Sequence, residues 1–223
     1  MLYKRLISTP RTLRFLESHS SLYTRHFSYS PSLHKPTMAE RDPSYKDRAP
    51  YQIRSDEEFG PAKWHASCHC GQVTYKISRD KPLNAKYCHC HGCQKTHGAP
   101  FQWCVIFHKQ DIMFNKGTEG LSFYSSQNKS RDYHLPTKVA CNHCRSPIMD
   151  EGRNVCLLFP ELIDCQASGV DRDTWRKTFE NKMHIFYGGR AIDVPDGKPK
   201  WDGLDEQSDA LDDYGNPKGS SRM

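Results

Sequence analysis

The chain of 223 residues is long enough for one domain with a hydrophobic core and additional tails. Its apolar fraction of 36% is low for a soluble domain, which indicates that part of the chain does not pack. The net charge is +6, but residues 1–36 contribute +5 of it, so the remainder carries only +1. A basic surface for nucleic acid is therefore not supported, and no apolar run approaches the roughly 18 residues of a membrane helix.

The N-terminal segment, residues 1–36, is rich in arginine and serine and almost free of acidic residues. Pro10 interrupts a series of leucines at helical spacing, which comprises Leu2, Leu6, Leu13 and Leu16. This composition is typical of a mitochondrial transit peptide, and residues 25–28 look like a processing site with cleavage near Phe27. The alternatives are a disordered basic tail, or an untranslated extension upstream of a working start at Met38, which places the protein in the cytoplasm.

Residues 37–61 carry prolines and acidic residues and predict a polar linker. A single domain is then expected over residues 62–195. Residues 73–78 alternate apolar and polar side chains with the period of a half-buried strand, and the apolar run 101–107 predicts a more buried strand. The other strand candidates, punctuated by glycine, asparagine and proline, are residues 112–114, 121–125, 138–140, 155–159 and 184–187.

Helices are expected to be few and short. One or two helical turns are predicted around residues 171–179 and again around residues 205–212. The C-terminal extension, residues 196–223, is polar and acidic, with Trp201 and Leu204 as expected anchors onto the domain. The sequence therefore predicts a mainly β protein, in which short strands and long loops bury little apolar surface.

Seven cysteines form three clusters, which are Cys68 and Cys70, then Cys88, Cys90 and Cys93, then Cys141 and Cys144. Clustered thiolates bind metal, and Zn²⁺ is the ion that best suits tetrahedral sulfur. Both sulfurs of an extended C-x-C pair project from one face, and a tight turn does the same for C-x2-C. Because seven thiols do not fill two tetrahedra, a division into four and three leaves one site closed and the other with a free coordination position. A closed site of this kind contributes directly to folding.

Spacing alone does not show which clusters share an ion, and other readings of the cysteines compete. Disulfides need an oxidising compartment, and the N-terminus does not resemble a secretory signal peptide. A thioredoxin-like pair at Cys141 and Cys144 should open a helix in a βαβ unit, whereas these residues lie among strand-like segments. A histidine can also close the three-cysteine site as a fourth ligand. The nearby histidines, which otherwise can donate hydrogen bonds to sulfur or carry a proton, are His89, His91, His97 and His143.

Four stretches carry a resemblance to a known family, and they are residues 68–75, 88–95, 98–101 and 141–147. They resemble the glutathione-dependent formaldehyde-activating enzymes, a family that also contains centromere protein V. Residues 195–204 look like the C-terminal extension of the family's fungal members. One departure is Arg145, because the family commonly has glycine after the last cysteine. If that position needs a positive φ, the arginine is strained there.

The resemblance implies a fold of the Mss4-like type, with small antiparallel sheets pinned by two zinc sites per chain. The residues that it assigns to a structural zinc are Cys68, Cys70, Cys141 and Cys144. The residues that it assigns to a catalytic zinc are Cys88, Cys90 and Cys93. It also implies an activity, the joining of formaldehyde and glutathione into S-hydroxymethylglutathione, which is classed as carbon–sulfur lyase chemistry.

Three thiolates on one Zn²⁺ make an electron-rich site that is a weak Lewis acid toward water but well suited to holding a substrate thiol as its thiolate. Glutathione also brings two carboxylates, for which Lys95 is the first candidate partner and Arg131 the second. Both cations are equally well explained as solvated surface charges. Of the cysteines outside the clusters, Cys104 and Cys156 are expected to be buried apolar side chains and Cys165 a free thiol.

Two functions from different classes follow. The first is a zinc-dependent carbon–sulfur lyase that acts on adducts of glutathione, or another small thiol, with an aldehyde. The second is a zinc-stabilised module that binds protein or nucleic acid without catalysis, although the near-neutral domain argues against strong phosphate-driven binding. A zinc hydrolase is disfavoured by ligation through sulfur alone. No membrane association is expected, and the sequence does not predict an oligomeric state.

Overall fold

The structure is a computed structural model that describes residues 43–219, which belong to one compact unit. The segment 1–36 lies outside the described residues, so mitochondrial targeting and the alternative start at Met38 stay predictions. None of the helices in the described part has the length and apolar character that crossing a membrane requires.

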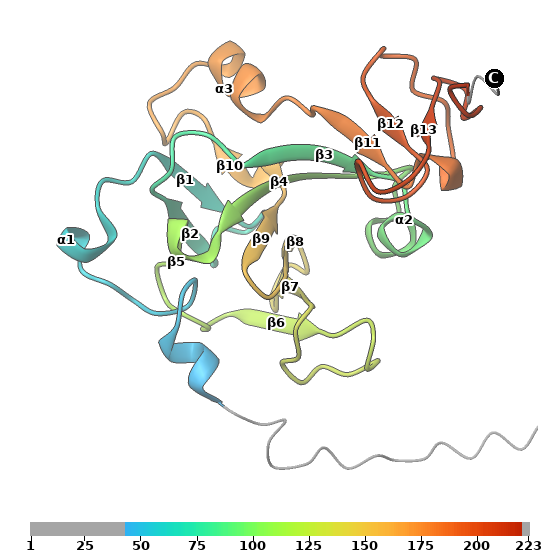
Figure 1. Cartoon of the computed structure of the whole chain (residues 1–223). Coiled ribbons are helices and arrows are strands. Elements are labelled where there is room, and N and C mark those ends of the chain that lie inside the picture. The colour runs from blue at the N-terminus through green and yellow to red at the C-terminus, as the bar shows by residue number, and fades with distance from the viewer. Residues whose placement is uncertain (1–42, 220–223) are drawn as a thin grey trace, which may run out of the picture. The chain divides into compact units, whose positions relative to one another are not determined.

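The regular structure is mainly β, as the sequence predicts, and its strands form two sheets (Figure 1). The smaller sheet is antiparallel with the order β10-β1-β2-β5, and its strands are β1 (Trp64–Ser67), β2 (Thr74–Ile77), β5 (Ile112–Phe114) and β10 (Ile163–Asp164). The larger sheet has the order β13-β12-β11-β3-β4-β9-β8-β7-β6, in which β11 runs parallel to β3 and β12. Its strands are β3 (Asn84–Cys88), β4 (Gln102–His108), β6 (Leu121–Tyr124), β7 (Thr137–Cys141), β8 (Pro147–Glu151), β9 (Val155–Leu158), β11 (Met183–Ile185), β12 (Lys200–Trp201) and β13 (Ala210–Leu211).

The described residues contain three short α-helices, which are α1 (Asp56–Phe59), α2 (His91–His97) and α3 (Arg172–Phe179). Helix α3 confirms the helix predicted around residues 171–179. It begins at Asp171 because the carboxylate of this residue accepts hydrogen bonds from the backbone N–H groups of Asp173 and Thr174. Helix α2 was not predicted, and it carries one of the cysteine clusters.

One continuous hydrophobic core takes side chains from both sheets. Tyr75 of β2 and Phe107 of β4 are both buried in it. Helix α3 adds Trp175 and Phe179, whose rings pack edge to face with centroids 5.4 Å apart. Full burial of one large apolar side chain stabilises a fold by about 1.5–3 kcal/mol, so these contacts fix the position of β4 and of its neighbour β3.

Packed residues are already present before residue 62, within the stretch 37–61 for which the sequence predicts a polar linker. Tyr51 is only 1% exposed, and its hydroxyl donates a hydrogen bond of 2.6 Å to Glu151 on β8. Tyr133 and Lys109 donate to the same carboxylate at 2.7 and 2.6 Å. A buried carboxylate is stable only with such partners, so Tyr51 ties this segment to the larger sheet.

The C-terminal extension is ordered where it is described, and of its two predicted anchors Trp201 lies in β12 and is partly buried, whereas Leu204 does not pack. Leu204 is 49% exposed, whereas Lys200 and Leu211 are buried. The prediction of a helix around residues 205–212 is wrong, because this stretch forms turns and strand β13. Ser208 closes the first of these turns, since its hydroxyl donates to the carbonyl of Leu204 and so competes with a helical hydrogen-bond pattern.

We predict that Tyr51→Phe lowers the free energy of unfolding by about 1.5–3 kcal/mol, because it removes a hydrogen bond to the buried charge of Glu151. Tyr124→Phe is the matched control, since the Tyr124 ring is 40% exposed. Urea denaturation of both variants and of the unmodified chain measures the difference. Equal stability of the two variants would contradict the burial of the segment before residue 62.

Candidate functional site

Four cysteines from distant parts of the chain bring their sulfur atoms within 4.8 Å of one another, and they are Cys68, Cys70, Cys141 and Cys144. The Sγ atom of Cys70 lies 3.5 Å from that of Cys68 and 3.9 Å from that of Cys141. Cys68 directly follows β1 in the smaller sheet, and Cys141 ends β7 in the larger sheet. The group therefore joins the two sheets, and its membership is the one that the family resemblance implies.

Both halves of this four-cysteine group are tight turns with a residue in the left-handed region. Gly71 has φ +75° and donates its N–H to the carbonyl of Cys68, whereas Arg145 has φ 65° and donates to the carbonyl of Cys141. The positive φ that was in question at Arg145 is therefore present. A side chain in this region costs about 1–3 kcal/mol, which the rest of the turn must offset. The C-x-C pair here lies in a turn and not on an extended strand.

A second group consists of Cys88, Cys90 and Cys93, whose sulfur atoms also lie within 4.8 Å of one another. Cys88 is the last residue of β3. Cys90 is the N-cap of α2, and its sulfur accepts a hydrogen bond of 3.4 Å from the backbone N–H of Cys93. The end of one strand and the first turn of one helix thus supply all three sulfur atoms.

Hydrogen bonds among the three thiols of this group change their pKa values. Hydrogen bonding to Cys88, and then to Cys93, lowers the pKa of the Cys90 thiol far below its ordinary value. Hydrogen bonding to Cys90 in turn raises the pKa of Cys88 to about 12. Ionised thiols at this separation repel each other, so one thiolate disfavours ionisation of its neighbours.

The donor set of both groups fits Zn²⁺, since each consists only of sulfur atoms close enough to share one ion. A bound cation neutralises the thiolates that otherwise cannot form together. Within residues 43–219 neither group includes a histidine nitrogen, an aspartate or a glutamate. The four-cysteine group can fill a tetrahedron, whereas the three-cysteine group leaves one position for a further ligand.

The four histidines near the clusters have different surroundings. His91 and His143 are exposed. His89 is fully buried, and its Nε2 lies 2.9 Å from Nδ1 of His184. Burial lowers the pKa of His89 to about 4, so the ring is neutral near pH 7. Burial also lowers the pKa of His97, whose Nε2 is buried without a hydrogen-bond partner.

A cavity of about 280 Å³ adjoins helix α2 on the side of the larger sheet. Thr96 and His97 form its helical wall, three and four residues after Cys93 and so on the same face of the helix. Strands β6, β7 and β8 form the opposite wall. Arg131 and Arg145 contribute two cationic side chains to the lining. The cavity thus connects the helix of the three-cysteine group with the turn of the four-cysteine group.

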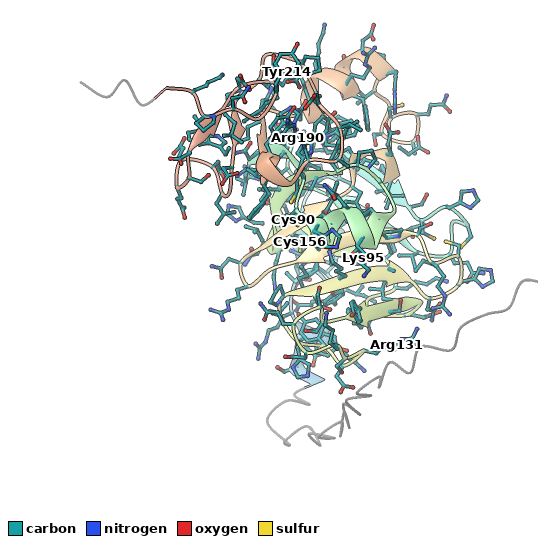
Figure 2. The ribbon with its side chains drawn as sticks, turned by 90° about the vertical axis from the view of Figure 1, so that its right-hand side faces the viewer. Cys90, Lys95, Arg131, Cys156, Arg190 and Tyr214 are labelled. Carbon is teal, nitrogen blue, oxygen red and sulfur yellow. The ribbon has the colours of Figure 1, made fainter. Side chains whose placement is uncertain are left out.

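The two predicted carboxylate partners lie in different places. Lys95 is exposed on α2 and does not line the cavity, whereas Arg131 does. In Figure 2 Lys95 lies close to Cys90 and Arg131 lies farther below. Arg145 was noted only for its backbone, and the structure adds it as a second cation of the cavity. A third lining cation, Lys138, is already paired with Asp150 at 2.9 Å.

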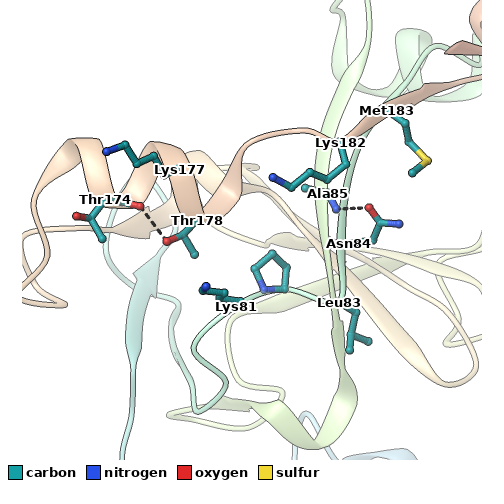
Figure 3. Close-up of a pocket in the computed structure, with 10 residues that line it drawn as sticks. Lys81, Leu83, Asn84, Ala85, Thr174, Lys177, Thr178, Lys182 and Met183 are labelled. Carbon is teal, nitrogen blue, oxygen red and sulfur yellow. Dashed lines mark hydrogen bonds between the residues drawn. The ribbon is translucent and has the colours of Figure 1, made fainter. Parts of the chain in front are cut away.

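A larger cavity of about 640 Å³ lies between α3 and the start of β3 (Figure 3). Its lining includes Lys81, Lys177 and Lys182 but no cysteine or histidine. Leu83, at its edge, is 44% exposed. This cavity has size but no reactive group, so we assign the candidate site to the smaller cavity, whose lining includes His97 of the helix that carries Cys93.

The remaining cysteines are not part of either group. Cys104 and Cys156 are buried, as expected, and burial raises the pKa of the Cys104 thiol to about 12. Cys165 is partly buried against the core and forms no disulfide. These residues act as small apolar side chains and provide controls for the clustered cysteines.

A family model and one curated relative point to the same family. The family model described as glutathione-dependent formaldehyde-activating enzyme matches residues 63–189, which include all seven clustered cysteines. A Halomonas elongata protein that carries this enzyme name provisionally is 24% identical over 139 residues, which are 60% of this chain and 76% of that protein. The structure also matches the crystal structure of a Rhodobacter sphaeroides protein with a TM-score of 0.37 and 18% identity, over 49% of this chain and 92% of that one.

We predict that the full chain binds two Zn²⁺ ions and that Cys144→Ser removes the ion of the four-cysteine group. Because this group joins the two sheets, the variant should also unfold about 10 °C earlier, the shift that about 3 kcal/mol produces in a domain of this size. Mass spectrometry of metal content and thermal unfolding measure the two effects. Cys165→Ser should keep both ions and its stability, and an equal loss in both variants would contradict the assignment.

Proposed function

The chain belongs to the family of glutathione-dependent formaldehyde-activating enzymes, and from this premise we propose that it joins glutathione to formaldehyde or a related aldehyde, or cleaves the adduct. The observation that carries the proposal is the three-cysteine group. It offers three cysteine sulfur atoms to one ion, and among the described residues no fourth side chain joins them. Zn²⁺ is the ion that we propose for both groups. A zinc ion in the three-cysteine group supplies the positive charge that lowers the pKa of a substrate thiol.

The proposed reaction forms a bond between the glutathione sulfur and the aldehyde carbon. The sulfur provides the electron pair after losing its proton, and the carbonyl oxygen takes up one proton as the C=O double bond becomes a single bond. The reverse direction breaks the same carbon–sulfur bond, which is the sense in which the reaction is a lyase reaction. No oxidant or reductant is needed in either direction.

We propose that the 280 Å³ cavity holds the peptide part of glutathione. Arg131 and Arg145 face this cavity and are suited to the two carboxylates of the tripeptide, since arginine binds carboxylates through two parallel hydrogen bonds. The same helical face leads from Thr96 and His97 back to Cys93, so a thiol bound here lies toward the three-cysteine group. The four-cysteine group has no free position and is assigned a structural role.

We predict that the zinc-loaded full chain accelerates exchange between free formaldehyde, glutathione and their adduct, because the three-cysteine group activates the thiol. Two-dimensional exchange NMR measures the rate against the uncatalysed background. Cys93→Ser should abolish the acceleration, and Cys165→Ser should retain it. A chain with two bound zinc ions and no acceleration would contradict the proposal and favour a zinc-stabilised binding module.

We predict that Arg131→Ala raises the KM for glutathione about 10–100-fold with little change in kcat, because a lost contact to a charged carboxylate costs about 1.5–3 kcal/mol of binding. The same assay on Arg176→Ala, an exposed arginine of α3, is the control. Lys95→Ala separates the two candidates that the sequence offers. If Lys95→Ala raises KM and Arg131→Ala does not, the cavity is not the binding site.

A further inference from the structure

A chain of buried polar side chains leads from the three-cysteine group into the C-terminal extension. It begins at His89, which lies between Cys88 and Cys90 in the sequence and is fully buried. The next member is His184 of β11, whose Nδ1 lies 2.9 Å from Nε2 of His89 and whose side chain is 0% exposed. The two imidazole rings are stacked with centroids 5.2 Å apart.

This series of hydrogen-bonded side chains continues into residues that follow the family-matched region, which ends at residue 189. Nε2 of His184 lies 2.9 Å from the Asp196 carboxylate. The other oxygen of this carboxylate accepts a hydrogen bond of 2.7 Å from Lys200, whose side chain is 0% exposed. Lys200 also contacts Asp213 at 2.6 Å. A buried ammonium between two carboxylates is stabilised by both, so the extension is held firmly here.

Lys200 and Asp196 determine which atom donates and which accepts in each hydrogen bond of this series. Hydrogen bonds from Lys200 and His184 outweigh the effect of burial and lower the pKa of Asp196 well below its ordinary value, so it is an acceptor only. His184 must then donate through Nε2. Burial lowers the pKa of His184, so its ring is neutral and its Nδ1 accepts from the Nε2–H of His89. One carboxylate thus fixes the tautomers of two rings.

The backbone around His89 is held from the same side. Its N–H donates to the carbonyl of Ile185 at 3.0 Å, next to the parallel pairing of Ile185 with Cys88. The side chain of Gln94 donates to the carbonyls of His89 and Gly189, each at 2.8 Å. Ring and backbone contacts together set the conformation of the loop that carries Cys88 and Cys90.

We propose that residues 196–200 act as a brace for the three-cysteine loop, with Asp196 as a positioning residue that acts through His184 and His89. The proposal rests on the proposed role of the three-cysteine group as a metal centre. The brace lies on the side of this loop that pairs with β11, so it does not fill the cavity whose walls are α2, β6, β7 and β8. In Figure 2 Arg190 and Tyr214, which flank this segment in the sequence, lie above Cys90, and Arg131 lies below it.

The test compares Asp196→Asn with Asp213→Asn in the full chain. Both residues accept from Lys200, but only Asp196 contacts His184. An amide offers one acceptor and one donor, so residue 196 can no longer accept from Lys200 and His184 together. Loss of a supporting contact behind a metal ligand lowers metal affinity 10–100-fold in other proteins, and we expect about tenfold here because the contact is indirect.

Cadmium-113 NMR of the cadmium-loaded chain reads the two metal centres separately, and chelator competition gives their affinities. In Asp196→Asn we expect a changed resonance and about tenfold weaker binding at the three-cysteine centre, with the four-cysteine centre unchanged. Asp213→Asn should leave both resonances and both affinities as in the unmodified chain. Equal effects of the two variants, no effect of either, or a change at the four-cysteine centre would overturn the proposal.

A measurement on the unmodified chain covers the case in which Asp196→Asn does not fold. Long-range ¹H–¹⁵N correlation spectra report which ring nitrogen of each histidine carries the proton. The proposal requires protonated Nε2 in both His89 and His184, and protonation of His184 at Nδ1 would overturn it. None of these readouts depends on turnover, so an inactive chain can still support the brace, and a failed brace leaves the proposed function unaffected.

Discussion

Crowding of thiols is the constraint on which the rest of this structure depends. Sulfur atoms within 4.8 Å of one another cannot all become thiolates unless a cation lies among them. The described residues contain two such groups of thiols. In the four-cysteine group the backbone of Arg145 also adopts the unfavourable left-handed conformation. Because the four-cysteine group joins the ends of β1 and β7, a metal ion bound there would also hold the two sheets together.

The three-cysteine group lies between a cavity, to which helix α2 leads, and a network of buried hydrogen bonds formed by β11 and the C-terminal extension. Helix α2 places Cys90 and Cys93 at its start and Thr96 and His97 at its end, so a helix of seven residues connects the sulfur atoms with an open, cationic cavity. On the other side, β11 and the C-terminal extension hold His89 by buried hydrogen bonds. A rigid side and an accessible side are what a site needs when it must keep its ligand geometry while a substrate enters.

The cysteine clusters were predictable because the ligands within each cluster are close together in the sequence. The mainly β class was predictable because the alternation of apolar and polar residues along a strand is also a local pattern. Helix α2 was missed because its seven residues have no apolar periodicity, and it begins where Cys90 caps it and ends at Gly98 with φ +58°. Lys95 was preferred because it is close to Cys93 in sequence, whereas Arg131 reaches the cavity from a distant loop. The partners of Tyr51 and His89 lie 100 and 95 residues away, and no spacing rule predicts such pairs.

The measurement that tests this account most directly is zinc-edge X-ray absorption of the zinc-loaded chain before and after addition of glutathione. The account predicts seven sulfur ligands and one lighter ligand over the two ions of the free protein, because the groups contain four and three cysteines. It predicts eight sulfur ligands once glutathione is bound. Eight sulfur ligands from the start, or a ligand set that glutathione leaves unchanged, would contradict an open three-cysteine centre that receives the substrate thiol.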